Sequence, residues 1–266
     1  MKILAIGDPH GDLKKIKKIP IKDVDLILLT GDLGKADFAR KRFFDNIKRK
    51  QQGLPELEET PKDARDSYME IHNSTIELLR YLSKYAPVYA LQGNVGIATP
   101  SRVKEVKEEH GIKVPCTRDQ IDRMSNVGIV KNRLRVFKEL RVGFLEFFTD
   151  ISWVKEFKPR DYRETMAKAR KQTEKAKRIL RRFDGDLDIL VCHQPPYGIL
   201  DRVNFPGAPK NWQGKRAGSK AVLDYIKKYQ PRHVFCGHIH EAEGMKKLGK
   251  TLVYNLGVAG HVVVDI

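Results

Sequence analysis

The sequence of 266 residues has little cysteine, and the spacing excludes two common structural uses of that residue. Cys116, Cys192 and Cys236 are an odd number and form no CxxC pair. Neither a disulfide framework nor a structural zinc site is therefore expected. Cys192 and Cys236 each end an apolar run, where a free thiol behaves as a small hydrophobic side chain. We expect both thiols to be buried and chemically inert.

Long apolar stretches are also absent from the sequence. No run approaches the roughly 20 residues that cross a bilayer. The N-terminal MKILAIGDPHG has a short apolar run that breaks into Gly, Asp and Pro, so a signal peptide is not expected either. These absences favour a cytoplasmic protein with no membrane partner.

Acidic residues are outnumbered, with 34 Asp and Glu against 51 Lys and Arg, which gives a formal net charge of +17. Such an excess attracts anions, so phosphorylated substrates and nucleic acid are both candidate partners. A charged surface also accompanies high growth temperature, so charge alone does not decide the function. The length and the 41% of hydrophobic residues are typical of one globular domain over residues 1–266.

Short apolar runs bounded by turn residues predict buried strands. They are Lys2–Ile6, Asp25–Thr30, Pro87–Leu91, Leu187–Cys192 and Arg232–Cys236. Helical spacing lies between them, at Tyr68–Leu82 and at Tyr162–Phe183. The alternating runs within Val127–Phe148 predict neighbouring antiparallel strands. Together these patterns indicate an α/β fold of two packed sheets flanked by helices.

Several segments fall outside this regular pattern. Gln51–Pro61 is expected to be a mobile surface loop, and Tyr197–Gly218, which follows His193, is expected to border a substrate pocket. Lys215 and Arg216 are placed to meet a substrate phosphate, and Ser219 is expected to cap a helix that faces an anion. The basic segment Arg160–Arg182 is interpreted as a solvated helix packed on the core rather than a nucleic-acid surface.

Side chains that can bind metals follow the predicted strands at their C-terminal ends. In open α/β sheets these ends converge on the side where ligands bind. The mixture of carboxylates, an amide and imidazoles without thiolate suits Mn²⁺, Fe²⁺ or Zn²⁺. These donors are too many for one tetrahedral site, and two ions sharing a carboxylate would support hydrolytic phosphoryl chemistry. The candidate ligands are Asp8, His10, Asp32, Asn94, His193, His238 and His240.

The ordered motifs DPHG at 8–11, GD at 31–32, GN at 93–94, His193 and GHIH at 237–240 resemble the calcineurin-like metallophosphoesterase superfamily. The tail HQPPYGILD with GSKAVLDYI and GHIHEAEG further resembles its MPPED-type phosphodiesterase-like branch. This resemblance implies a four-layer sandwich of two mixed sheets flanked by helices. It also implies that Asp8, His10, Asp32 and His240 hold one ion. Asp32, Asn94, His193 and His238 would hold the other, with Asp32 as the bridge.

The sequence departs from the family pattern GNH[DE], because Val95 and Gly96 stand where the family has a histidine and an acid. In the family this histidine contacts the substrate phosphate and helps the leaving group depart. Val95 cannot transfer a proton, and losing a general acid costs about 10²–10⁴-fold in rate. Substrates with good leaving groups would suffer least.

The sequence therefore predicts a hydrolase in which a metal-bound hydroxide attacks a small phosphoester or nucleotide, with Asp32, Asn94 and His193 as catalytic residues. The expected cofactors are two divalent ions, manganese first, with Fe, Zn, Ni or Co as alternatives. Two other functions stay open: a metal-binding interaction module that has lost catalysis, and a nuclease. The oligomeric state is left open as well.

Overall fold

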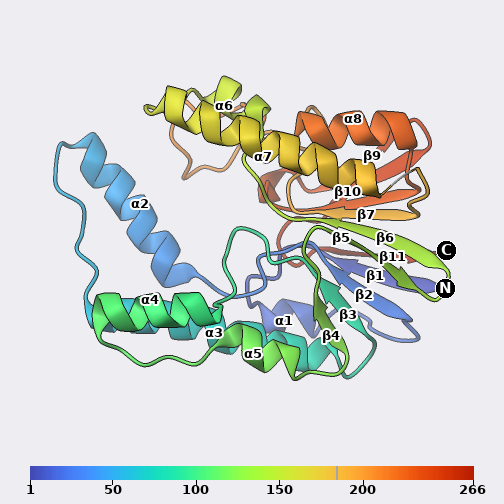
Figure 1. The fold of residues 1–266 in the computed structure, drawn as a ribbon, viewed down its shortest axis with the longest axis horizontal. Helices are drawn as coiled ribbons and strands as arrows, with labels where there is room; N and C mark the ends of the chain where they lie inside the picture. The colour runs from blue at the N-terminus through green and yellow to red at the C-terminus, as the bar shows by residue number, and fades with distance from the viewer. Residues whose placement is uncertain (184) are drawn as a thin grey trace.

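The computed structural model describes residues 1–183 and 185–266, with Gln51 described by its backbone alone. Two mixed β-sheets pack face to face at the centre, and helices cover the outer face of each (Figure 1). The chain is thus an α/β protein with two mixed sheets flanked by helices, as the sequence predicts.

The first sheet has the strand order β11-β1-β2-β3-β4. Strand β1 (Lys2–Ile6) pairs in parallel with β2 (Leu26–Leu29), and β3 (Val88–Ala90) and β4 (Val127–Ile129) continue in parallel. The edge strand β11 (His261–Asp265) is antiparallel to β1 and brings the two termini together. Parallel pairing places the C-terminal ends of β1, β2 and β3 along one edge of this sheet.

The second sheet has the order β5-β6-β7-β8-β10-β9. Its parallel centre consists of β6 (Leu140–Leu145), β7 (Ile189–Cys192), β8 (His233–Cys236) and β10 (Thr251–Asn255). The antiparallel edges are β5 (Arg133–Phe137) and β9 (Gly244–Leu248). The β5–β6 hairpin confirms antiparallel pairing within Val127–Phe148. Strand β4, however, joins the other sheet, because its partner is the parallel strand β3.

The strands are apolar on both faces because both faces are buried. In β1, Ile3 and Ala5 face the layer between the sheets, whereas Leu4 and Ile6 face the helices. The central layer also contains Phe144 and Phe235, which are fully buried. This two-sided burial explains why these strands appear in the sequence as continuous apolar runs.

One helical layer covers the first sheet and another covers the second (Figure 1). The first consists of α1 (Leu13–Ile16), α3 (Pro61–Leu82), α4 (Pro100–His110) and α5 (Thr117–Asp122). The second consists of α6 (Ile151–Phe157), α7 (Tyr162–Arg182) and α8 (Lys220–Tyr229). Helices α3 and α7 correspond to the two predicted helical patterns, and α7 buries Met166, Ala169, Thr173 and Ala176 as expected.

Helix α2 (Asp37–Gln51) was not predicted and stands apart from both layers (Figure 1). It buries no complete apolar stripe, so its sequence lacks the periodic signal that identifies a packed helix. The segment after it, which was predicted to be a loop, folds back on α2. The Leu57 amide donates to Asn46 at 2.8 Å there.

Two further expectations from the sequence concern the cysteines and membrane-spanning helices. All three cysteines are free, with Cys192 and Cys236 buried, and burial raises the pKa of the Cys192 thiol to about 12. Across residues 1–183 and 185–266, no helix is both long and apolar enough to cross a membrane.

Candidate metal centre

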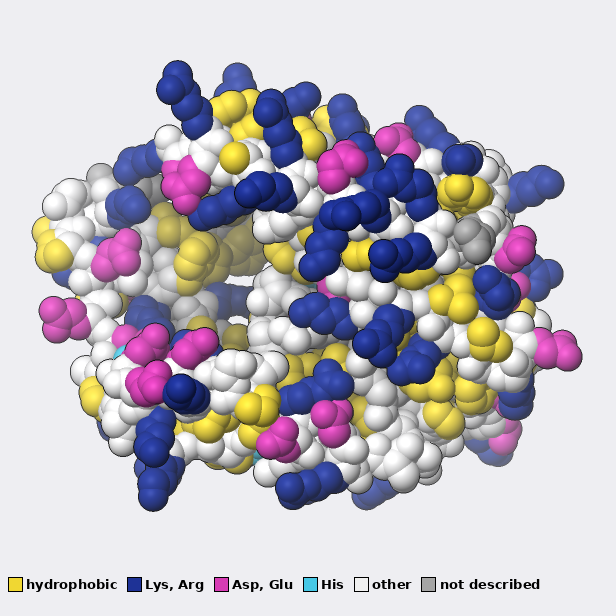
Figure 2. All heavy atoms as spheres, in the orientation of Figure 1, with side chains coloured by type: hydrophobic (Ala, Val, Ile, Leu, Met, Phe, Trp, Pro, Cys, Tyr) yellow, Lys and Arg dark blue, Asp and Glu magenta, His cyan; other side chains and the backbone are white. Residues whose placement is uncertain are grey.

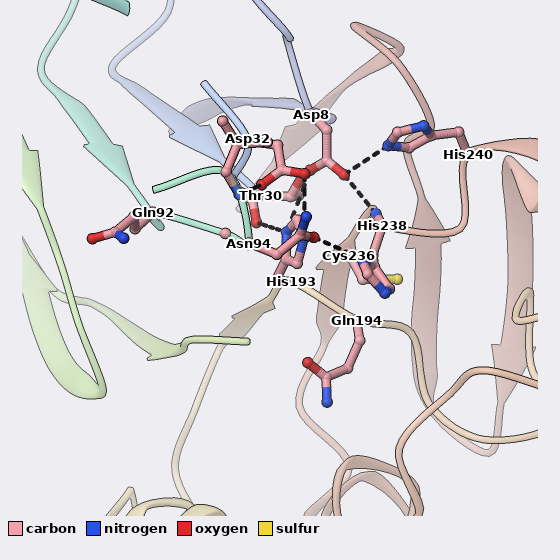
Figure 3. Close-up of polar contacts among 12 residues, drawn as sticks. Asp8, Thr30, Asp32, Gln92, Asn94, His193, Gln194, Cys236, His238 and His240 are labelled. Atoms are coloured by element: carbon pink, nitrogen blue, oxygen red, sulfur yellow. Dashed lines mark hydrogen bonds and ion pairs between the residues drawn. The ribbon is translucent and has the colours of Figure 1, made fainter. Parts of the chain in front are cut away.

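The seven predicted donors come from both sheets and meet at one place, and Figure 3 labels six of them, all except His10, which lies beside His240 and Asp32. Asp8 and His10 follow β1, Asp32 follows β2, and Asn94 follows β3 in the first sheet. His193 follows β7, and His238 and His240 follow β8 in the second sheet. The structure therefore brings together residues separated by up to 232 positions in the chain.

One group of donor atoms surrounds Asp8, His10 and His240. The Nε2 atoms of His10 and His240 face each other at 3.3 Å, and His240 Nε2 is also 3.3 Å from Asp8 Oδ2. Two imidazole nitrogens directed at one point, beside a fully buried carboxylate, are the kinds of donor atom that bind a cation. This donor set fits a divalent ion.

A second group contains Asp32, Asn94, His193 and His238. Asn94 Oδ1 lies 2.7 Å from His193 Nε2 and 2.9 Å from His238 Nδ1. His193 Nδ1 lies 3.0 Å from the Thr30 carbonyl, to which it donates, so Nε2 carries the free lone pair. That nitrogen is 3.7 Å from Asp32 Oδ2. These atoms also fit a divalent ion.

Asp32 lies between the two groups. Its Oδ2 atom is 3.8 Å from His10 Nε2 and 3.7 Å from His193 Nε2. Asp8 also approaches His193, at 3.6 Å, but through the Nδ1 atom that bonds Thr30. The atom placed to serve both groups is therefore Asp32 Oδ2.

Burial and neighbouring charges set the protonation of the cluster. Burial raises the pKa of the Asp8 carboxyl, but His193, His240 and Thr30 outweigh it, so this pKa falls below its ordinary value. Burial and, after it, the nearby His193 lower the pKa of His238 to about 3. Burial also lowers the pKa of His10. The carboxylate is thus ionised and the two imidazoles are neutral, which are the forms that bind metals.

The backbone at the site is tightly constrained. His10, Asp32 and His238 have φ values of 44°, 43° and 66°, in the left-handed region that ordinary residues seldom adopt. A Cβ atom at Gly93 would lie 2.3 Å from Asp32 Oδ1, so only glycine fits beside this carboxylate.

Sequence reasoning missed three residues that support the cluster. Thr30 donates its hydroxyl to Asp8 Oδ1 at 2.6 Å. Glu146 is buried and accepts the backbone amides of Gln92 and Gly93 at 2.8 and 3.2 Å. The Phe147 ring lies 5.0 Å from that of His238. Glu146 and Phe147 come directly after β6, just as the donors come directly after their own strands. That position after a strand is the signal in the sequence that could have identified them.

The two residues predicted to bind substrate phosphate have other partners. Arg216 Nη1 lies 2.9 Å from Asp201 Oδ1, and Lys215 Nζ lies 5.6 Å from the centroid of the Phe157 ring. Among the described residues, neither contacts a member of the donor cluster within hydrogen-bonding distance. Their substrate-binding role stays a prediction.

A cavity of about 640 Å³, lined by charged side chains of both signs, borders the cluster at His10. Its cations are Lys14, Lys17, Lys35 and Arg40, its acids are Asp12, Asp37 and Glu77, and Lys35 Nζ lies 3.1 Å from Asp37 Oδ2. Burial is the main cause that lowers the pKa of His10, Asp32 and Asp8 oppose it, and the Arg40 charge makes only a small further contribution. Among these cations, Lys14 lies in α1 and Arg40 lies in α2.

A sequence profile described as calcineurin-like phosphoesterase matches residues 1–242. The chain belongs to the calcineurin-like phosphoesterase family. The match extends over the whole donor set, from Asp8 to His240.

Two curated relatives, from Homo sapiens and Mus musculus, are named metallophosphoesterase domain-containing protein 1. Each is 43% identical to this chain over 74 residues, which cover 27% of this chain and 20% of the relative. The aligned part thus spans about a fifth of the length of these relatives.

Solved structures share the fold at low identity. One aligns with a TM-score of 0.61 at 16% identity, covering 99% of this chain and 94% of the other. Phosphopantetheinyl hydrolase from Mycobacterium tuberculosis aligns with a TM-score of 0.56 at 15% identity, covering 97% of this chain and 89% of that chain.

Proposed function

We propose that this chain is a dinuclear metal-dependent phosphoesterase that prefers phosphodiesters. The observation that carries the proposal is the position of Asp32 Oδ2, 3.8 Å from His10 Nε2 and 3.7 Å from His193 Nε2. One carboxylate oxygen within reach of an imidazole from each group can bridge a pair of ions. The preference for diesters follows the resemblance of residues 193–201 and 237–244 to the MPPED-type branch.

In this proposal each donor has a defined task. Asp8, His10 and His240 hold one ion, Asn94, His193 and His238 hold the other, and Asp32 contacts both. Bound divalent ions, manganese first among Mn, Fe, Zn, Ni and Co, would activate water and offset the charge on the phosphoryl oxygens. Thr30 fixes the tautomer of His193, and the cations around Arg40 attract the anionic substrate.

At the position where the family has a histidine, this chain has no side chain that could donate a proton to the leaving group. Val95 is half-buried and contributes its backbone amide, which donates to Asp32 Oδ1 at 2.7 Å. Gly96 is exposed and has no side chain. The proposed substrates are therefore esters whose leaving groups depart without a general acid.

The test is hydrolysis of bis(p-nitrophenyl) phosphate, whose leaving group is good, by the Mn²⁺-loaded protein. We expect turnover that Asp8→Ala abolishes. Activity against a dialkyl phosphate should be much lower, since its leaving group is poor and the missing general acid matters most there. Turnover that survives Asp8→Ala would place the reaction elsewhere.

The second candidate function is a metal-binding interaction module, which the loss of the histidine at Val95 favours. It differs from the enzyme in one measurable respect. The module would bind Mn²⁺ through the same residues yet hydrolyse none of several diesters, whereas the enzyme must do both.

A further inference from the structure

A groove of about 340 Å³ opens beside the donor cluster and is not used by the proposed chemistry. One wall is the loop at Gln92 and Gly93 that precedes Asn94, and the other is helix α7. Lys131, Phe147 and Lys175 also line it. The groove therefore lies between the loop that carries Asn94 and the basic helix α7, and its nearest approach to the donors is through Gly93 and Phe147.

Phe147 marks the end of the groove at the metal centre. Its ring centroid lies 5.0 Å from that of His238 and 5.8 Å from that of His193, so one side of the ring packs against the donors. The side chain is nevertheless 38% exposed. An aromatic ring held rigidly on one side and open to solvent on the other is a surface on which a nucleobase can stack.

The far end of the groove is positively charged. On α7, Gln172, Lys175, Ala176 and Ile179 follow one another at helical spacing and line the same wall. Figure 2 shows Lys and Arg side chains crowded over α7 on this face of the molecule. Lys131 and Lys175 are exposed and form no ion pair with the described residues. Both ammonium groups are available to a ligand.

Glu146 is the only acid among the described residues that line the groove, and it opposes the binding of an anion only weakly. Glu146 is 6% exposed, and its carboxylate accepts the amides of Gln92 and Gly93. Burial raises its pKa, although these bonds partly offset that effect. The charge that solvent meets in the groove is that of the two lysines.

From this juxtaposition we propose that the groove binds single-stranded nucleic acid, with one base stacked on Phe147 and a neighbouring phosphate held by Lys131 and Lys175. The strand would enter the metal centre beside Asn94, so that one phosphodiester reaches the donors. A single strand fits better than a duplex because stacking on Phe147 needs an unpaired base. This inference rests on the proposed phosphodiesterase function and names its substrate class.

The test measures binding separately from hydrolysis. Anisotropy of a fluorescein-labelled, hydrolysis-resistant phosphorothioate strand of ten thymidines is titrated with the full-length Mn²⁺-loaded protein. Phe147→Leu keeps apolar packing but removes stacking, and we expect it to weaken binding by at least about fivefold. Phe147→Tyr should bind as the wild type does. Lys131→Ala with Lys175→Ala should lower the salt slope of binding by about 0.7 per lysine.

The matched control removes two exposed lysines that do not line the groove, Lys22→Ala with Lys113→Ala. Retained binding in this control, together with loss in the groove variants, supports the proposal. Any of three results would overturn the proposal. They are equal weakening of binding by both lysine pairs, unchanged binding by Phe147→Leu, and binding of a duplex that is as tight as that of the single strand. If bis(p-nitrophenyl) phosphate is hydrolysed while the strand does not bind, the groove inference fails and the proposed function stands.

Discussion

At the scale of single residues, the candidate ligands are held by partners outside the cluster. Asp8 Oδ1 accepts the Thr30 hydroxyl, and Asp32 Oδ1 accepts the Val95 amide. His193 Nδ1 donates to the Thr30 carbonyl. Asp32 Oδ2 and His193 Nε2 are left facing the centre, whereas Asp8 Oδ2 faces His240 and also accepts the His238 backbone amide at 2.5 Å. Such outer bonds orient ligands before an ion arrives and reduce the entropy that binding must overcome.

The role of Asp32 can be measured by metal content. We expect about two ions per chain in the Mn²⁺-loaded protein. Asp32→Asn should reduce occupancy of both sites, because Oδ2 lies within 3.8 Å of an imidazole from each group. Asn94→Ala should leave about one ion, because Asn94 contacts His193 and His238 alone among the imidazoles. Elemental analysis of dialysed samples decides, and equal losses in both variants would argue against the bridge.

Glu146 is predicted to act as a positioning residue for the loop that carries Asn94. Glu146→Ala removes the acceptor of two backbone amides and leaves them buried, so we expect weaker occupancy of the Asn94 site and little change at the Asp8 site. Glu146→Gln keeps one acceptor oxygen and should recover part of the occupancy. Mn²⁺ titration by calorimetry separates the two sites. Uniform loss of both would indicate a general packing defect instead.

At the scale of secondary-structure elements, Ser219 at the start of α8 both caps its helix and contacts a residue of another element. Ser219 caps the helix, as its sequence position predicts, by accepting the Val222 amide at 3.1 Å. The anion at this N-terminus is a side chain of the protein itself. Asp150 accepts the Ser219 hydroxyl at 2.7 Å and the Ala221 amide at 3.3 Å. The N-terminus of α8 therefore faces a buried carboxylate that ties α8 to the start of α6.

Ser219→Ala should destabilise the protein by about 2 kcal/mol, because it removes the cap and one donor to a buried carboxylate. The matched control is Thr60→Ala at the exposed cap of α3, where about 1 kcal/mol or less is expected. Urea denaturation followed by circular dichroism gives both values. A smaller loss at Ser219 than at Thr60 would show that Asp150 contributes nothing.

At the scale of the whole molecule, the donor cluster joins the two sheets. Asp8, His10, Asp32 and Asn94 come from one sheet, and the remaining donors come from the other. An ion bound by residues of both sheets favours the state in which the sheets are packed. Metal binding and global stability should therefore be coupled.

Addition of Mn²⁺ at about a hundred times its dissociation constant should raise the melting temperature by about 5 °C or more. Asp8→Ala should remove most of this shift. Mg²⁺ at the same concentration should give little, because a site with four imidazoles suits softer ions better than magnesium. Differential scanning calorimetry provides the measurement, and equal shifts with both ions would contradict the assigned ligand set.

Much of the architecture could be predicted from local patterns. Strands β1, β2, β3, β7 and β8 were visible as apolar runs, and α3 and α7 as helical periods, because both kinds of element bury apolar side chains. Helix α2 was not visible, since it has no buried stripe to produce a period. Strand β4 could not be placed from its sequence, because its sheet is set by the partner it meets.

The sequence by itself determined which residues are candidate ligands, since their chemistry and their order along the chain are local facts, and it marked the missing histidine at Val95. It could not determine distances. The tertiary structure decided that Asp32 Oδ2 lies between two imidazoles, that Glu146 and Phe147 border the cluster, and that Arg216 pairs with Asp201. These relations join segments far apart in the chain, and only the packing of two sheets brings such segments together.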